Sequence, residues 1–231
     1  MGTQPGQAPA RQGVEALYPF LYAGDTDLDD VLAEVRRSTV AKAQEIVRLR
    51  EQVLDQYGAQ LAECAQAMAD SFAAGGRLLA FGNGGSSTDA QDVSSMFLQG
   101  DGGRPLPALS LAADIAVVTA LSNDIGFDVV FARQLAAMGR PGDIALGLST
   151  SGNSGNLVSA FEEAARRGMV TVGIAGGQGG KMAEADTIEH LFVIPSASVH
   201  RIQEAQTTVY HVLWELTQRI LAGEWERQSN R

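Results

Sequence analysis

The residue types best suited to chemistry are glycines and small hydroxyl or amide side chains gathered in two short runs. The first is Gly82-Asn-Gly-Gly-Ser86 and the second is Ser149-Thr-Ser-Gly-Asn-Ser154. Glycine lets the backbone turn sharply and approach a ligand closely, while hydroxyls supply hydrogen-bond donors. A helix after such a run adds free N–H groups and a partial positive charge at its N-terminus. Two such runs in one chain predict a site for a phosphorylated small molecule.

Ordinary helix caps and turns are the alternative explanation for the serines of these runs. Ser and Thr favour such positions whether or not a ligand is bound. A single run would be explained in that way without any site. Both runs, however, follow a strand-like segment and lead into a helix-like one, at 77–82 and at 144–149. The repeated arrangement favours phosphate binding over capping alone.

The two runs need elements that bring them together, and the hydrophobic pattern supplies them. Strand-like segments alternate with helix-like ones, the strands at 77–82, 107–113, 144–149, 170–175 and 190–195, and the helices at 86–99, 128–138, 154–167 and 201–222. Strands that are apolar on both faces and separated by helices predict an α/β three-layer sandwich around a five-stranded parallel sheet. Ligands bind beyond the carboxyl ends of such strands, where both runs lie.

A long helical region precedes the sheet. Apolar spacing predicts one helix from about 27 to 57 and a second from 59 to 73, which ends at Gly75-Gly76. We therefore expect a long N-terminal helix pair, and divide the chain into an arm-like or disordered extension at 1–26, a single domain at 27–223 and a tail at 224–231.

Composition narrows the class of protein. The 231 residues are 45% hydrophobic, enough for one domain with a full core. Seventeen Lys and Arg against 27 Asp and Glu give a net charge of −10, which argues against direct nucleic-acid binding. No apolar run reaches the roughly 20 residues of a membrane span. The lone Cys64 fits a buried structural thiol in the reducing cytoplasm.

These motifs resemble those of the SIS (sugar isomerase) domain proteins, and among them the phosphoheptose isomerases. The resemblance covers about 30–222 and rests on Gly82-Asn-Gly-Gly-Ser86, Ser122-Asn-Asp-Ile-Gly-Phe127, Gly147-Leu-Ser-Thr-Ser-Gly-Asn-Ser154, Gly179-Gly-Lys-Met182 and Arg201-Ile-Gln-Glu204. It implies homotetramers with sites shared between subunits. It also implies that the serines hold a sugar phosphate and that Asn83 and Asp124 hold its hydroxyls. The full set of implied contacts is Asn83, Gly84, Gly85, Ser86, Asn123, Asp124, Ser149, Thr150, Ser151, Ser154 and Gln203.

The resemblance implies aldose–ketose isomerisation of sedoheptulose 7-phosphate or a related sugar phosphate. This reaction needs a base beside the carbonyl, an acid for its oxygen and stabilisation of the enediolate. The family uses a Glu and a His, with zinc held by His, Glu, Gln and His. Gln203 and His211 match the last two and lie on one face of the final helix. Asp92 and Met96 replace the first two, and a thioether neither accepts a proton nor suits zinc.

A second departure offers compensation. His200 stands where the family usually has Asp, so Asp92, His200, Gln203 and His211 could form a rearranged metal site or an acid–base pair. The candidate catalytic residues are therefore His211, Asp92 and His200, with zinc a possible cofactor on Gln203, His211 and Asp92. The alternative is that His200 is a surface or capping residue.

Two functions remain open. One is a sugar-phosphate isomerase in which Asp92 or His200 replaces the missing Glu. The other is a non-catalytic sugar-phosphate sensor or regulator, similar to the DnaA-binding initiation regulators that also lack this glutamate. Because the helices still present an acid and two histidines, we favour the isomerase.

Overall fold

A computed structural model of the chain describes residues 28–100 and 102–223. The chain divides into two compact units, one ending at Glu45 and one beginning at Ile46. The expected extension at 1–26 and tail at 224–231 lie outside the described residues. The unit from Ile46 onward carries the sheet and the candidate site.

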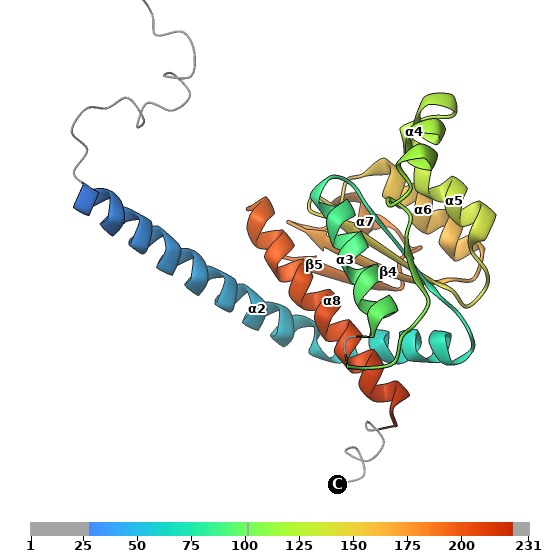
Figure 1. Cartoon of the computed structure of the whole chain (residues 1–231), viewed down its shortest axis with the longest axis horizontal. Coiled ribbons are helices and arrows are strands. Elements are labelled where there is room, and N and C mark those ends of the chain that lie inside the picture. The colour runs from blue at the N-terminus through green and yellow to red at the C-terminus, as the bar shows by residue number, and fades with distance from the viewer. Residues whose placement is uncertain (1–27, 101, 224–231) are drawn as a thin grey trace, which may run out of the picture. The chain divides into compact units, whose positions relative to one another are not determined.

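Five parallel strands form the sheet (Figure 1). They are β1 Leu78–Gly82, β2 Ala108–Ser110, β3 Ile144–Ser149, β4 Val170–Gly176 and β5 His190–Ile194, in the order β2-β1-β3-β4-β5. Leu78 of β1 is in register with Ala108 of β2 and with Ile144 of β3. The predicted five-stranded parallel sheet is confirmed.

Helices connect the strands and follow the predicted order in most places. They are α2 Leu28–Ala73, α3 Gly85–Gln99, α4 Ile115–Asp124, the 3-10 turn η2 Phe127–Val129, α5 Val130–Met138, α6 Gly155–Arg166, α7 Gly180–Glu184 and α8 Val199–Leu221. The expected N-terminal helix pair is wrong, because α2 continues through Gly58. A single glycine costs a helix about 1 kcal/mol relative to alanine, and the buried Val53 and Leu61 on either side keep the apolar stripe continuous.

Two hydrophobic clusters pack the helices against the two faces of the sheet. Alternate strand residues point to opposite faces, so Leu78 and Ala80 join the cluster with α3, α8 and the part of α2 from Ile46 onward. Phe81 joins the other cluster, with α5 and α6, and its ring lies 5.5 Å from Phe131 and 5.2 Å from Phe161. The three-layer α/β architecture is therefore confirmed.

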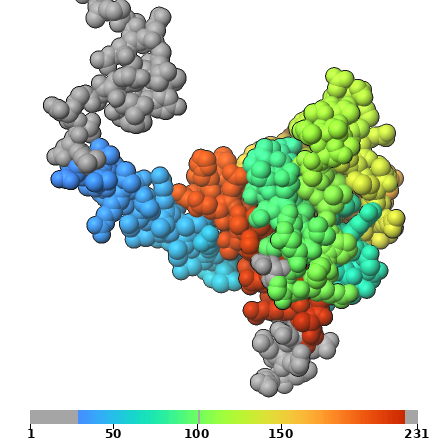
Figure 2. Space-filling model, viewed as in Figure 1, coloured from blue at the N-terminus to red at the C-terminus, as the bar shows by residue number. Residues whose placement is uncertain are grey.

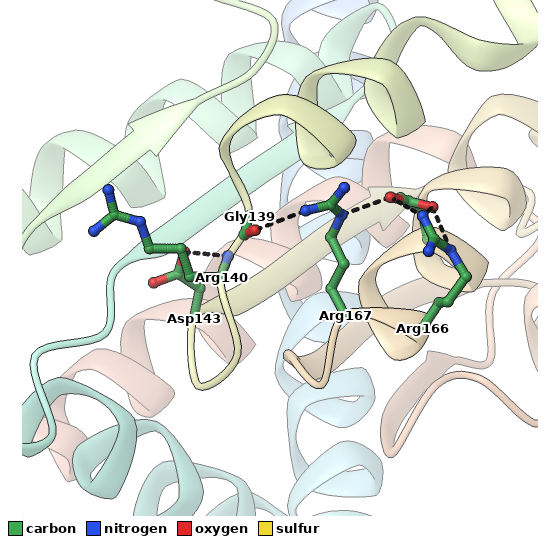
Figure 3. A network of polar contacts seen from close by, with 6 residues as sticks. Gly139, Arg140, Asp143, Arg166 and Arg167 are labelled. Carbon is green, nitrogen blue, oxygen red and sulfur yellow. Dashed lines mark hydrogen bonds and ion pairs between the residues drawn. The ribbon is translucent and has the colours of Figure 1, made fainter.

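Hydrogen bonds brace the amino ends of β1 and β3, at the edge opposite the two Ser/Gly runs. The buried Asp143 carboxylate accepts from the backbone N–H of Arg77 at 3.1 Å and of Arg140 at 3.0 Å. It also pairs with the Arg77 guanidinium at 3.2 Å. Nearby, Arg167 Nη1 donates to the Gly139 carbonyl at 3.1 Å (Figure 3). These contacts fix the amino ends of the two strands whose carboxyl ends lead into the candidate loops.

Helix α4 was not predicted and contributes no buried residue to the fold. Its Ile115 is 71% exposed, and Phe127 just beyond it is 50% exposed. Asp114 caps this helix by accepting hydrogen bonds from Ala116 and Val117. Among the described residues, no helix combines the length and the apolar character needed to cross a membrane.

Candidate functional site

The two Ser/Gly runs meet at the carboxyl edge of the sheet. The side-chain amides of Asn83, after β1, and Asn156, in the first turn of α6, form two reciprocal hydrogen bonds of 2.9 Å. The loop after β4 joins them, because Lys181 N donates to Asn153 Oδ1 at 3.1 Å. A β-carbon on Gly152 would collide with the Gly179 backbone, so glycine is required there. Three loops thus form one surface.

The loop after β3 presents hydroxyls to this surface. Ser149 Oγ accepts from Gly152 N at 3.0 Å and lies 3.3 Å from Ser154 Oγ. Ser154 stands at the N-cap of α6, but its side chain makes no capping hydrogen bond. Ser151 Oγ accepts from Asn153 N at 3.2 Å, a local turn contact. Simple capping therefore does not explain Ser154, and the first turn of α6 keeps free N–H groups beside it.

The loop after β1 depends on its glycines. Gly84 precedes α3 with a φ of 56°, a left-handed conformation that favours glycine. A β-carbon on Gly85 would collide with the Gln203 amide nitrogen. Ser86 is buried, whereas Ser87 and Thr88 donate their hydroxyls to nearby backbone carbonyls. The start of α8 therefore lies directly against the start of α3.

Polar side chains continue between these two helices, which lie side by side on one face of the molecule (Figure 2). Gln203 Nε2 donates to Asp89 Oδ2 at 3.4 Å, and Tyr210 Oη donates to Asp92 Oδ2 at 2.7 Å. We call the residues Asp89, Asp92, Gln203, Thr207 and Tyr210 the α3–α8 seam. Asp92 thus lies in the predicted region, but its partner is a tyrosine.

Burial raises the pKa of two side chains in this seam. It raises the pKa of the Asp89 carboxyl above its usual value, an effect that the Gln203 hydrogen bond opposes and the Asp92 charge reinforces. Burial also raises the pKa of Tyr210, and the hydrogen bond to Asp92 and the negative charge of that carboxylate raise it further. The phenol therefore remains a neutral donor at physiological pH.

The two candidate histidines lie at the surface of α8. His200 is exposed in its first turn, and His211 is exposed with its ring stacked on that of Tyr210 at 5.3 Å. Within the described chain, no hydrogen bond or ion pair joins either histidine to Asp92. Asn123 and Asp124 lie exposed at the end of α4, where Asn123 Nδ2 donates to Asp124 Oδ1 at 2.9 Å. A single chain therefore assembles only part of the predicted site.

The seam does not fit a zinc ion. Over residues 28–100 and 102–223, no three His, Cys, Asp or Glu side chains gather as a metal would require. Met96 packs against the hydrophobic core, and the Asp92 carboxylate is bonded to Tyr210. Gln203 directs its amide nitrogen at Asp89, although a metal needs the amide oxygen.

Sequence reasoning missed five residues of this region: Asp89, Asn156, Gln206, Thr207 and Tyr210. Gln206 is fully buried, and its Nε2 donates to the carbonyls of Ser149 at 3.2 Å and Ile174 at 2.9 Å. It therefore ties α8 to the ends of β3 and β4. Helical spacing was the available signal, since 203, 207 and 210 share one face of α8.

Sequence comparison identifies a family and individual relatives that this chain resembles. The family model described as the SIS domain matches residues 43–176, more than half of the chain. The "Phosphoheptose isomerase" of Halorhodospira halophila is 42% identical over 180 residues, which cover 77% of this chain and 91% of that relative. Its counterpart in Desulfovibrio desulfuricans is 43% identical over 182 residues, covering 77% and 84%.

A solved structure extends the agreement to the fold. The phosphoheptose isomerase of Neisseria gonorrhoeae superposes with a TM-score of 0.71 at 34% identity, over 79% of this chain and 98% of that one. The chain therefore belongs to the SIS domain family and, within it, to the phosphoheptose isomerase group.

Proposed function

We propose that this protein binds a sugar phosphate at the carboxyl edge of its sheet and interconverts the aldose and ketose forms of that sugar. Sedoheptulose 7-phosphate is the proposed substrate, because the similar proteins are named phosphoheptose isomerases. The observation that carries the proposal is the joining of two Ser/Gly loops through Asn83 and Asn156, with the Ser154 hydroxyl free of capping.

The proposed phosphate site is the loop after β3. Ser149, Ser151 and Ser154 would donate their hydroxyls to the phosphate, and the first turn of α6 would add backbone N–H groups. Gly84 and Gly85 allow close approach of the sugar to the loop after β1. The proposed contacts to the rest of the ligand are Asn83, Ser86, Asn123, Asp124, Thr150 and Gln203. With the phosphate in the loop after β3, the carbons that react would lie at the α3–α8 seam.

The proposed reaction moves one proton between adjacent carbons through an enediol. Asp92 takes the proton from the carbon beside the carbonyl and returns it to the neighbouring carbon. His211 is the proposed acid at the carbonyl oxygen, with His200 as the alternative. Asp89 is a further candidate acceptor, since its carboxyl is half-buried beside Gln203. Because the seam does not fit zinc, no step is assigned to a metal.

We propose a homotetramer in the cytoplasm, with sites shared between subunits. Exposed apolar residues on and beside α4, which are Ile115, Val117, Ile125 and Phe127, support a further subunit over this surface. Asn123 and Asp124 would then complete a neighbour's site. Light scattering after size-exclusion chromatography tests this assembly; four chains per particle are expected, and a stable monomer would contradict it.

Incubation with sedoheptulose 7-phosphate tests the proposed reaction. Purified full-length protein is followed by NMR for appearance of the aldose phosphate, with and without added zinc. The Ser149→Ala/Ser154→Ala variant is the control for contaminating enzyme. Product formation by the wild type and not by the variant is expected. Absence of product in both zinc conditions would refute the isomerase.

A sensor without catalysis is the second candidate function. Met96 favours it, because this thioether occupies the position of the family's base and packs against the core. A sensor of the initiation-regulator kind would bind the sugar phosphate, produce no aldose, and remain inactive as Met96→Glu. Turnover by the wild type would exclude this function.

A further inference from the structure

The α3–α8 seam differs from the metal site that the family resemblance implies, and the structure shows what replaces it. We propose that Tyr210 positions Asp92 through a hydrogen bond that takes the place of a metal ion, so that the Asp92 carboxylate acts as a metal-independent proton acceptor. Its kinetic part rests on the proposed isomerase function; its metal part does not.

The geometry assigns the phenolic proton to Asp92. Tyr210 is 1% exposed, so its ring is fixed in the core while its hydroxyl reaches Asp92 Oδ2 at 2.7 Å. The competing acceptor, Thr207 Oγ1, lies farther away at 3.4 Å. Thr207 uses its own proton on the Gln203 carbonyl, at 3.0 Å, so it cannot donate to Tyr210. The single Tyr210 proton therefore holds one oxygen of Asp92.

The remaining seam contacts leave no set of ligands for a metal. Gln203 is held by its amide nitrogen against Asp89, and the missing β-carbon of Gly85 makes room for this orientation. Met96 packs its side chain against the core. Protein donors thus occupy one oxygen of each carboxylate that faces α8. The free oxygen of Asp92 would be a single ligand, fewer than a zinc ion requires.

Asp92 retains the capacity that the reaction needs. Its side chain is exposed, and the hydrogen bond from Tyr210 occupies Oδ2. Oδ1 can therefore accept the proton from the carbon beside the carbonyl and later return it to the adjacent carbon. The carbonyl oxygen gains one proton in the first half and the neighbouring hydroxyl loses one in the second. The exchange balances without a further reactant.

Metal content gives the first test, independent of activity. Elemental analysis and zinc titration calorimetry are applied to full-length wild type and to Asp92→His/Met96→Glu, which restores the family's ligand types. We expect far less than one zinc per chain in the wild type and one per chain in the double variant. One zinc per wild-type chain, lost in Asp92→Asn, would overturn the proposal.

Kinetics on sedoheptulose 7-phosphate give the second test. Loss of a positioning hydrogen bond in Tyr210→Phe should lower kcat about 10- to 100-fold while KM changes less than about threefold. Adding Tyr210→Phe to Asp92→Asn should lower kcat little further, because both variants disrupt the same interaction between Tyr210 and the Asp92 carboxylate. The matched control is Tyr57→Phe, whose hydroxyl accepts from Val193 N away from the seam; it should keep the wild-type kcat.

The outcomes distinguish failure of the Tyr210 positioning role from failure of the proposed isomerase function. Unchanged kcat in Tyr210→Phe, or multiplicative losses in the double variant, would refute the positioning role. A wild type with no turnover would refute the isomerase itself, and the Tyr210–Asp92 contact is then tested by urea denaturation. Tyr210→Phe and Asp92→Asn should show coupled, non-additive losses of stability, and additive losses would refute the contact.

Discussion

Replacement of Gln206 by methionine tests how the phosphate loop is held. The Gln206 side chain reaches from α8 to β3 and β4, where its Nε2 donates to the carbonyls of Ser149 and Ile174. Methionine has a similar length and no hydrogen-bond donor. Gln206→Met therefore removes both bonds while leaving the packing of this buried position nearly unchanged.

The expected loss can be worked from these contacts. Each neutral hydrogen bond contributes about 0.5–1.5 kcal/mol net, so the pair contributes about 1–3 kcal/mol. Gln206 Oε1 is buried without a partner among the described residues, and its removal offsets part of that loss. We expect the free energy of unfolding to fall by about 1–2 kcal/mol. Because Ser149 begins the phosphate loop, affinity for sedoheptulose 7-phosphate should fall about tenfold.

Urea denaturation and titration calorimetry measure the two effects. Thr217→Val is the matched control, since Thr217 is also fully buried on α8 and its Oγ1 has no partner within the described part of the chain. This control should keep or slightly increase stability and leave affinity unchanged. Wild-type values for Gln206→Met in both measurements, or an equal loss of affinity in Thr217→Val, would contradict this role of Gln206.

Three further predictions concern the scaffold. Burial raises the pKa of the Cys64 thiol, so a disulfide reagent at neutral pH should label it only after unfolding; rapid native labelling would contradict this. Burial lowers the pKa of His190 against the opposing charges of Glu189 and Glu63, so the unfolded chain binds its proton more readily. The stability that neutral His190 contributes is therefore present above its unfolded pKa of about 6.5 and is lost as pH falls through its lower folded pKa. Urea denaturation should show a smaller loss of stability on acidification in His190→Gln than in the wild type. Asp143→Ala removes the brace at the amino ends of β1 and β3 and should cost about 2–4 kcal/mol by urea denaturation, whereas an unchanged midpoint would count against that role.

Local pattern was sufficient to predict the sheet. Strands β1, β3 and β4 are almost fully buried, so their apolar runs show little alternation, and the helices between them leave a parallel arrangement as the simplest solution. The Ser/Gly runs end the strands and begin the helices, so their meeting at one edge follows from parallel topology. The strands and the Ser/Gly runs that follow them can be recognised from short stretches of sequence.

Elements that depend on distant contacts were not predictable in the same way. The boundary expected between 57 and 59 is absent, because the apolar stripe of α2 continues through Gly58. Helix α4 buries no residue within this chain, so it lacks the amphipathic pattern by which a helix is usually found. Its exposed apolar side chains would be buried only against a surface outside this chain.

The candidate site shows the same division. Ser149 and Ser154 could be singled out from their motif, because phosphate binding uses local backbone geometry. Helical spacing places Tyr210 on the same face of α8 as Gln203, but its bond to Asp92 depends on α3 lying beside α8. The spacing of Gln203 and His211 placed them on α8 but did not show which group each one faces.

Calorimetric titration with sedoheptulose 7-phosphate and with unphosphorylated sedoheptulose tests the central claim, that the joined loops bind a sugar phosphate. Wild type should bind the phosphate ester at least about 100-fold more tightly than the free sugar, since hydrogen bonds to a charged group contribute about 1.5–3 kcal/mol each. Ser149→Ala/Ser154→Ala should lose most of that preference. Equal affinity for the two sugars, or binding of neither, would contradict the account.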